Sequence, residues 1–179
     1  MKRGPFERPH LRLAALCLSV ALTSSAFADS PQEVPIGGTL REATLAGLNG
    51  PSRRLSAFRG KPLIINVWAS WCEPCREEMA SLERLAWRDQ RRGFAIIGIS
   101  TDDYADKAKG ALKNANATIS HFIDDRLQME NMLGASKIPL TVFVAADGRV
   151  LAKVYGAKEW DGADALRFID QTFYPAPPR

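Results

Sequence analysis

The sequence predicts an α/β fold with a mixed central sheet, helices on both faces of that sheet and a short N-terminal β extension. Apolar runs of strand length at 63–68 and 94–99 are separated by a segment with helical spacing. Two later strand-like runs, 141–145 and 150–155, flank Asp147-Gly148, which is a strong hairpin signal. Strands that alternate with helices and are followed by a hairpin are typical of a sheet covered by helices.

In the first half of the chain, apolar spacing distinguishes strands from helices. Thr39–Leu45 alternates imperfectly and is expected to form an edge strand, and Leu55–Arg59 is expected to form one helical turn. The run 63–68 is apolar almost throughout, as in a strand covered on both faces. From Cys72 to about Gly93, apolar residues recur every three or four positions, which indicates a helix before the next buried strand.

Capping and turn residues delimit the elements of the second half. Asp102 or Asp103 is expected to cap a helix, and Gly134 is expected to end one. In chain order, the expected elements are a helix up to Ala115, a short strand or merely extended chain at Ile119–Ile123, a short helix at Arg126–Leu133, the hairpin, and a last helix at Asp161–Thr172.

The first 28 residues have the composition of a secretory signal peptide. A basic start precedes an apolar segment from Leu13 to Thr23, and Ala26-Phe27-Ala28 has the small residues of a cleavage site. The apolar segment is shorter than the roughly 20 residues of a spanning helix, which favours cleavage over an uncleaved membrane anchor. We therefore expect export to the periplasm or another extracytoplasmic compartment. The expected divisions are a signal peptide at 1–28, a linker at 29–38, the folded domain at 39–174 and a Pro-rich tail at 175–179.

Removal of the signal segment would change both charge and cysteine content. Residues 1–28 contain four of the 24 basic residues and one of the 20 acidic ones, so the net charge would fall from +4 to about +1. That charge gives no case for nucleic-acid binding. Of the three cysteines, Cys17 would leave with the signal segment, while Cys72 and Cys75 would stay without a disulfide framework around them. Catalytic use of this pair is the economical interpretation.

The two cysteines lie in Trp71-Cys72-Glu73-Pro74-Cys75, where a strand is expected to turn into a helix. A helix N-terminus presents unpaired N–H groups and roughly half a positive charge, which stabilises a thiolate, the nucleophilic form of cysteine. A static disulfide would close too small a loop to stabilise the fold much. A zinc site usually needs four ligands, and only His121 could join the pair. Thiol–disulfide exchange is therefore the favoured chemistry.

The sequence around this pair resembles the thioredoxin superfamily, and more narrowly the exported TlpA/ResA/CcmG-type thiol–disulfide oxidoreductases. The likeness covers about residue 34 to the C-terminal helix, and it rests on Val67–Met79, Gly60-Lys61-Pro62 and Lys137–Thr141. It implies a thioredoxin-like fold in which Cys72 is the attacking thiol and Cys75 resolves the mixed disulfide.

The resemblance also implies the partners. The substrates would be disulfides in other exported proteins, with cytochrome c apoproteins or copper-site assembly factors as the leading classes. No bound cofactor or metal is expected beyond the redox-active Cys72–Cys75 disulfide, which a membrane-borne thiol donor would reduce again. The chain is expected to act as a monomer.

Further site residues follow from the same resemblance. Pro139 is expected to be cis and to lie against the cysteines, exposing the backbone of Ile138 to an extended substrate. Glu78, one helical turn after Cys75, is expected to handle protons, because Asn66 stands where thioredoxins proper carry a buried acid. The residues expected to face the substrate are Trp71, Glu73, Pro74 and Ile138, with Trp68 in the core.

The direction of the reaction is predicted from charge. Glu73 and Glu78 both oppose thiolate formation, and a less stabilised thiolate makes a less oxidising couple, so we predict a reductant. Two other functions stay open. One is a copper-binding chaperone that uses Cys72, Cys75 and His121. The other is a peroxiredoxin-like thiol peroxidase, against which the W-C-x-P-C pattern argues.

Overall fold

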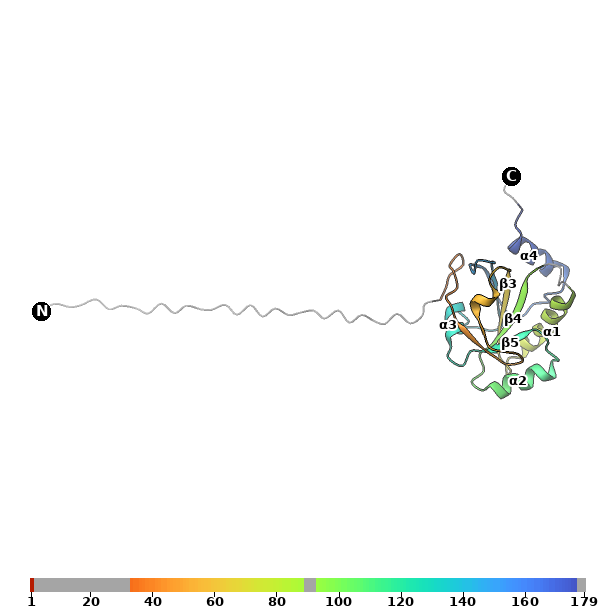
Figure 1. Ribbon diagram of the computed structural model, residues 1–179, viewed down its shortest axis with the longest axis horizontal. Helices are drawn as coiled ribbons and strands as arrows, with labels where there is room; N and C mark the ends of the chain where they lie inside the picture. The colour runs from red at the N-terminus through yellow and green to blue at the C-terminus, as the bar shows by residue number, and fades with distance from the viewer. Residues whose placement is uncertain (2–32, 89–92, 177–179) are drawn as a thin grey trace.

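A computed structural model describes residues 1, 33–88 and 93–176, and its folded part is built around a seven-stranded sheet (Figure 1). The sheet order is β2-β1-β5-β4-β3-β6-β7. The strands are β1 (Thr44–Gly47), β2 (Arg53–Arg54), β3 (Leu63–Trp68), β4 (Ala95–Ser100), β5 (Ser120–Ile123), β6 (Leu140–Val144) and β7 (Val150–Tyr155). The helices are the 3-10 turn η1 (Leu55–Phe58) and α1 (Glu73–Arg88), α2 (Ala105–Asn114), α3 (Gln128–Leu133) and α4 (Ala163–Phe173).

The sheet is mixed, as predicted. β3, β4 and β5 run parallel to one another, whereas β6 is antiparallel to β3 and β7 is antiparallel to β6. The carboxyl ends of the three parallel strands therefore meet at one edge of the sheet, and the chain leaves β3 for the two cysteines at that edge. The start of β6 lies there as well, because Leu140 pairs with Val67.

Helices cover both faces of the sheet, and alternate residues of β3 point to opposite sides. Leu63, Ile65 and Val67 pack in a core cluster that includes residues of α3 and of the N-terminal segment. Ile64 packs with residues of α1 and α4, and Trp68 packs with residues of α1 and α2. All six residues of β3 are buried, which the unbroken apolar run at 63–68 predicted.

Several boundaries agree with the sequence prediction. η1 is the single helical turn expected near Leu55, and Gly134 ends α3 in the left-handed conformation, with φ of 74°. The hairpin of β6 and β7 turns at Asp147-Gly148, where Gly148 has φ of 89°. The expected end of α1 near Gly93 falls partly on residues 89–92, outside the described residues.

Other expectations need correction. The first strand begins at Thr44 rather than at Thr39, and Thr39 forms an isolated bridge with Arg149. The described part of the expected linker, 33–38, is attached to the domain: Val34 is buried in the core and its N–H donates to the carbonyl of Met132 at 2.8 Å. An apolar side chain that fits the core outweighs the flexibility suggested by the Pro and Gly residues around it.

The termini are described only in part. The segment 1–28, which is expected to be a signal peptide, lies outside the described residues apart from Met1, as do residues 177–179 of the Pro-rich tail. In the described part of the chain, no helix is both long and apolar enough to cross a membrane.

Candidate active site

The two cysteines lie at the strand-to-helix turn that the sequence predicted. β3 ends at the buried Trp68, the N–H of Cys72 donates to the carbonyl of Ala69 at 3.1 Å, and α1 begins at Glu73. The N–H of Arg76 then donates to the carbonyl of Cys72 at 3.2 Å. Cys72 therefore stands at the N-terminus of α1, where the helix dipole is positive.

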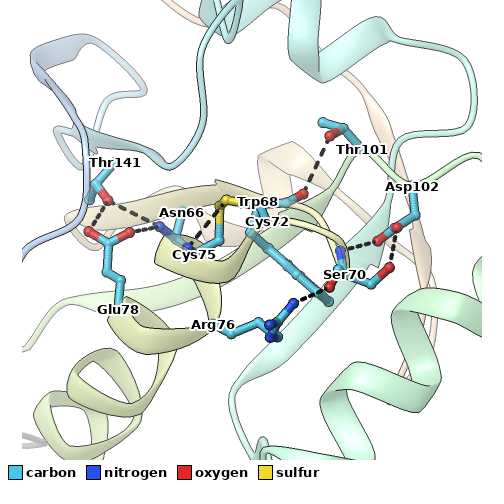
Figure 2. Close-up of a disulfide and its surroundings, with 10 residues drawn as sticks. All are labelled: Asn66, Trp68, Ser70, Cys72, Cys75, Arg76, Glu78, Thr101, Asp102 and Thr141. Atoms are coloured by element: carbon cyan, nitrogen blue, oxygen red, sulfur yellow. Dashed lines mark hydrogen bonds between the residues drawn. A yellow bond between two sulfur atoms is a disulfide. The ribbon is translucent and has the colours of Figure 1, made fainter.

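Cys72 and Cys75 are joined by a disulfide, and the two sulfurs have different surroundings. Cys72 is 6% exposed and Cys75 is fully buried. The backbone N–H of Cys75 donates to Sγ of Cys72 at 3.3 Å (Figure 2). A hydrogen bond from a helix N-terminus to one sulfur, together with the greater exposure of that sulfur, makes Cys72 the better nucleophile of the pair.

Asp102 fixes the loop that leads into the cysteines, a role that the sequence reasoning missed. Its carboxylate accepts the backbone N–H of Ser70 at 2.9 Å and the Ser70 hydroxyl at 2.6 Å, and it also accepts the Ser100 hydroxyl at 2.8 Å. Arg76 donates to the carbonyl of Ser70 at 2.7 Å, so Ser70 is held from two sides (Figure 2). The expectation that Asp102 or Asp103 caps α2 is wrong, because the capping position is Tyr104 and makes no side-chain cap bond.

Glu78 lies one turn after Cys75 on α1 and is 1% exposed. Asn66 donates to its Oε2 at 3.0 Å, the Thr141 hydroxyl lies 3.5 Å from its Oε1, and the indole N–H of Trp160 donates to the same Oε1. Burial raises the pKa of Glu78, and the hydrogen bonds from Trp160 and Asn66 counter that rise in part. In Figure 2, Glu78, Asn66 and Thr141 lie on the opposite side of the disulfide from Asp102.

Three of the four residues expected to face a substrate are exposed, and the fourth, Ile138, is half-buried. Trp71 is 71% exposed, and Glu73 and Pro74 are exposed in the first turn of α1. The peptide bond between Ile138 and Pro139 is cis. Ile138 is half-buried and packs against the cluster that contains both cysteines, which brings the start of β6 to the disulfide.

His121 is buried beside this site but does not join it. Its ring packs edge-on against Trp68, with centroids 5.5 Å apart, and its Nε2 lies 4.0 Å from Oε1 of Glu83, beyond hydrogen-bond distance. Neither ring nitrogen has a hydrogen-bond partner among the described residues. The described residues also contain no group of three or more His, Cys, Asp or Glu side chains placed to hold a metal ion, so Cys72, Cys75 and His121 are not assembled into a copper site.

Sequence comparisons agree with this geometry. The Redoxin family matches residues 35–167. Thiol-disulfide oxidoreductase ResA of Geobacillus thermodenitrificans is 28% identical over 146 residues, which cover 82% of this chain and 82% of that protein. Thiol-disulfide oxidoreductase ResA of Bacillus subtilis (strain 168) is 24% identical over 156 residues, covering 87% of each chain.

Solved structures share the fold. A putative thiol:disulfide interchange protein DsbE from Chlorobium tepidum superposes with a TM-score of 0.70 at 22% identity, covering 76% of this chain and 96% of that chain. A putative protein disulfide isomerase from Bacteroides thetaiotaomicron has a TM-score of 0.66 at 25% identity, with 78% and 91% covered. The chain therefore belongs to the Redoxin family, as a thioredoxin-like thiol–disulfide oxidoreductase of the TlpA/ResA/CcmG type.

Proposed function

We propose that the chain is an exported thiol–disulfide reductase whose reactive group is the Cys72–Cys75 dithiol. The Cys72 thiolate attacks one sulfur of a substrate disulfide, forms a mixed disulfide and releases the other substrate sulfur as a thiol. Cys75 then loses its proton and attacks Sγ of Cys72, which forms the Cys72–Cys75 disulfide and releases the second substrate thiol. Two electrons pass from the dithiol to the substrate, and each departing substrate sulfur takes a proton from solvent, which balances the two protons lost when Cys72 and Cys75 ionise.

The hydrogen bond from the Cys75 N–H to Cys72 Sγ is the observation that carries this assignment. It gives the two sulfurs unequal roles, because a thiolate on Cys72 gains a donor and the dipole of α1, whereas Cys75 is buried one turn inside the helix. A nucleophile that is more accessible than the fully buried resolving thiol suits exchange with a large partner, which need only reach Cys72.

Glu78 is the proposed acceptor of the Cys75 proton. It is three residues after Cys75 on α1, so the two side chains share one face of the helix. Its raised pKa brings its proton exchange closer to neutral pH, where a general base works best. Asn66, whose amide bonds this carboxylate, has no titratable proton of its own.

The proposed direction is reduction. Glu73 is exposed in the first turn of α1 and Glu78 is buried one turn after Cys75, and both carboxylates oppose a thiolate at the site.

We further propose that residues 1–28 direct export and that a membrane-borne thiol donor restores the dithiol. The proposed substrates are disulfides of other exported proteins, such as cytochrome c apoproteins or copper-site assembly factors. No cofactor besides the disulfide is proposed.

Trapping on a Cys75→Ser variant tests this function, because without the resolving thiol the reaction stops at the mixed disulfide. In an extract of exported proteins, we expect covalent complexes that reducing agent releases. Cys72→Ser/Cys75→Ser is the matched control and should trap nothing. Equal trapping by a Cys72→Ser variant would contradict the assigned roles, and no trapping together with failure of the wild-type dithiol to reduce insulin disulfides would contradict the function.

A further inference from the structure

Trp160 lies in the loop between β7 and α4, a segment to which the sequence prediction gave no function. Its side chain is 1% exposed, and its indole N–H donates a hydrogen bond to Oε1 of Glu78. Its backbone N–H donates to the hydroxyl of Ser81 at 3.0 Å, three residues further along α1. Trp160 is therefore bound at two points to the helix face that carries the buried carboxylate.

Contacts on both sides of Trp160 fasten its loop. Arg84 donates to Asp161 at 2.7 Å and to Glu159 at 2.9 Å, which ties the loop to α1. The ring of Phe143, on β6, packs against the indole with centroids 5.4 Å apart. These contacts hold the indole in one position, so the donor reaches Glu78 without first having to be ordered.

The indole N–H differs from the other donors to Glu78. Asn66 shares its amide between Glu78 and the Thr141 hydroxyl, at 3.0 and 3.1 Å. Trp160 is a donor only and directs its single N–H at the carboxylate. A hydrogen bond to an ionised oxygen is roughly twice as strong as one between neutral groups, so this donor favours the ionised form of Glu78.

The charged groups near Glu78 do not account for a preference for its ionised form. β3 and β6 contribute the neutral Asn66 and Thr141. Arg84 pairs with both acids of the loop, and Lys158 brings the sum of these four charges to zero. The charged side chains near this region in the chain or in the adjoining cleft come from α1, the loop and the start of α4, and they are Glu77, Arg84, Lys158, Glu159, Asp161 and Asp164.

We propose that Trp160 is the positioning residue of Glu78: its indole N–H holds the carboxylate on the face of α1 that carries Cys75 and favours the ionised, proton-accepting form. The proposal rests on the proposed function, in which the Cys75 proton passes to Glu78 and the electron pair left on sulfur forms the bond to Cys72. Trp160 also lines a cleft together with Val154 and Phe168.

Trp160→Phe tests the proposal in the full chain, because phenylalanine keeps an aromatic ring at this position and removes the indole N–H together with the five-membered ring. The reduced protein is mixed with 5,5′-dithiobis(2-nitrobenzoate), and release of the second nitrothiobenzoate reports the attack by Cys75 across pH. Without the donor, ionisation of Glu78 needs a higher pH, so the midpoint of this phase should rise by about one pH unit, the size expected for losing one hydrogen bond to a charged group. Trp87→Phe is the matched control. Trp87 is an exposed tryptophan of α1, the helix that carries Glu78, and its replacement should leave the midpoint unchanged.

Glu78→Gln separates failure of this proposal from failure of the function. If Glu78→Gln flattens the profile and Trp160→Phe leaves it unmoved, Trp160 does not position Glu78, and the proposed function stands. If Glu78→Gln also leaves the profile unmoved, the proton-transfer role itself is wrong.

A measurement on the unaltered residue covers the case in which Trp160→Phe does not fold. The indole ¹⁵N–¹H resonance of Trp160 should shift with pH in the wild-type protein and stay constant in Glu78→Gln. A resonance that shows the same pH dependence in both proteins would overturn the proposal.

Discussion

Asp102 holds Ser70 through two hydrogen bonds, one to its backbone N–H at 2.9 Å and one to its hydroxyl at 2.6 Å. Ser70 stands two residues before Cys72, so this pair joins the end of β4 to the loop that carries the nucleophile. The carboxylate of Asp102 is buried. If it were removed, the groups that donate hydrogen bonds to it would lose this acceptor.

Replacement of Asp102 by alanine should therefore destabilise the protein. Loss of the carboxylate leaves the N–H of Ser70 and the hydroxyls of Ser70 and Ser100 without this acceptor, and we expect a loss of about 1–3 kcal/mol in the free energy of unfolding, measured by denaturant titration. Asp103 is the exposed neighbour, and Asp103→Ala should change the free energy of unfolding by less than about 0.5 kcal/mol. Equal effects of the two substitutions would contradict the role assigned to Asp102.

The unequal surroundings of the two sulfurs predict unequal reactivity. In the reduced protein, iodoacetamide should alkylate Cys72 at least about tenfold faster than Cys75 near pH 7, because Cys72 is the more exposed and receives the N–H of Cys75. Mass spectrometry of peptides at short reaction times measures the ratio. Preferential alkylation of Cys75 would reverse the assignment of nucleophile and resolving thiol.

The buried carboxylate of Glu78 predicts a pH-dependent stability of known sign. Burial raises its pKa above the usual 4.5, so at intermediate pH the folded protein binds a proton that the unfolded chain has released. Its contribution to the free energy of unfolding is complete below about pH 4.5 and is lost as pH rises through the raised pKa. Denaturant titration at successive pH values gives the free energy of unfolding of the wild-type protein and of Glu78→Gln. The wild-type value minus the variant value should decrease above pH 4.5. A difference that grows with pH would show that the pKa of Glu78 is lowered.

Gly98 makes room for the buried His121. A Cβ at this position would lie 2.0 Å from Nδ1 of His121, so Gly98→Ala forces a ring that is fixed against Trp68 to move. We expect a loss of about 3 kcal/mol or more, at the upper end for overpacking of a core. Gly110→Ala meets open space within α2 and should instead stabilise the protein by about 0.5–1 kcal/mol. Thermal unfolding of the two variants provides the comparison, and a neutral Gly98→Ala would contradict the packing described for His121.

Local sequence patterns were enough to predict the sheet and the position of the cysteines. The unbroken apolar run of β3 and the helical spacing after Cys72 depend on neighbours in the chain, and both the strand and the start of α1 are where those patterns indicated. The cis bond before Pro139 was expected from resemblance alone, since the residues around it carry no local signal for cis.

The hydrogen bonds that position the site residues join residues far apart in the sequence, and local sequence patterns could not predict them. Trp160 is 82 residues from Glu78 along the chain, and Asp102 is 32 residues from Ser70. For Trp160, a single aromatic residue within the charged stretch Lys158–Asp161 was the available signal. Asp102 resembled a helix cap because an acid shortly before a helix usually is one, but its carboxylate is bonded to Ser70 and Ser100 instead.

The reduction potential of the Cys72–Cys75 pair tests the central claim most directly. Equilibration of the wild-type protein with dithiothreitol buffers of known potential at pH 7 should give a value near that of thioredoxin, about −270 mV, because Glu73 and Glu78 oppose the thiolate. A value near about −120 mV, that of a strongly oxidising exported enzyme, would show that the thiolate is strongly stabilised and would contradict the assignment as a reductase.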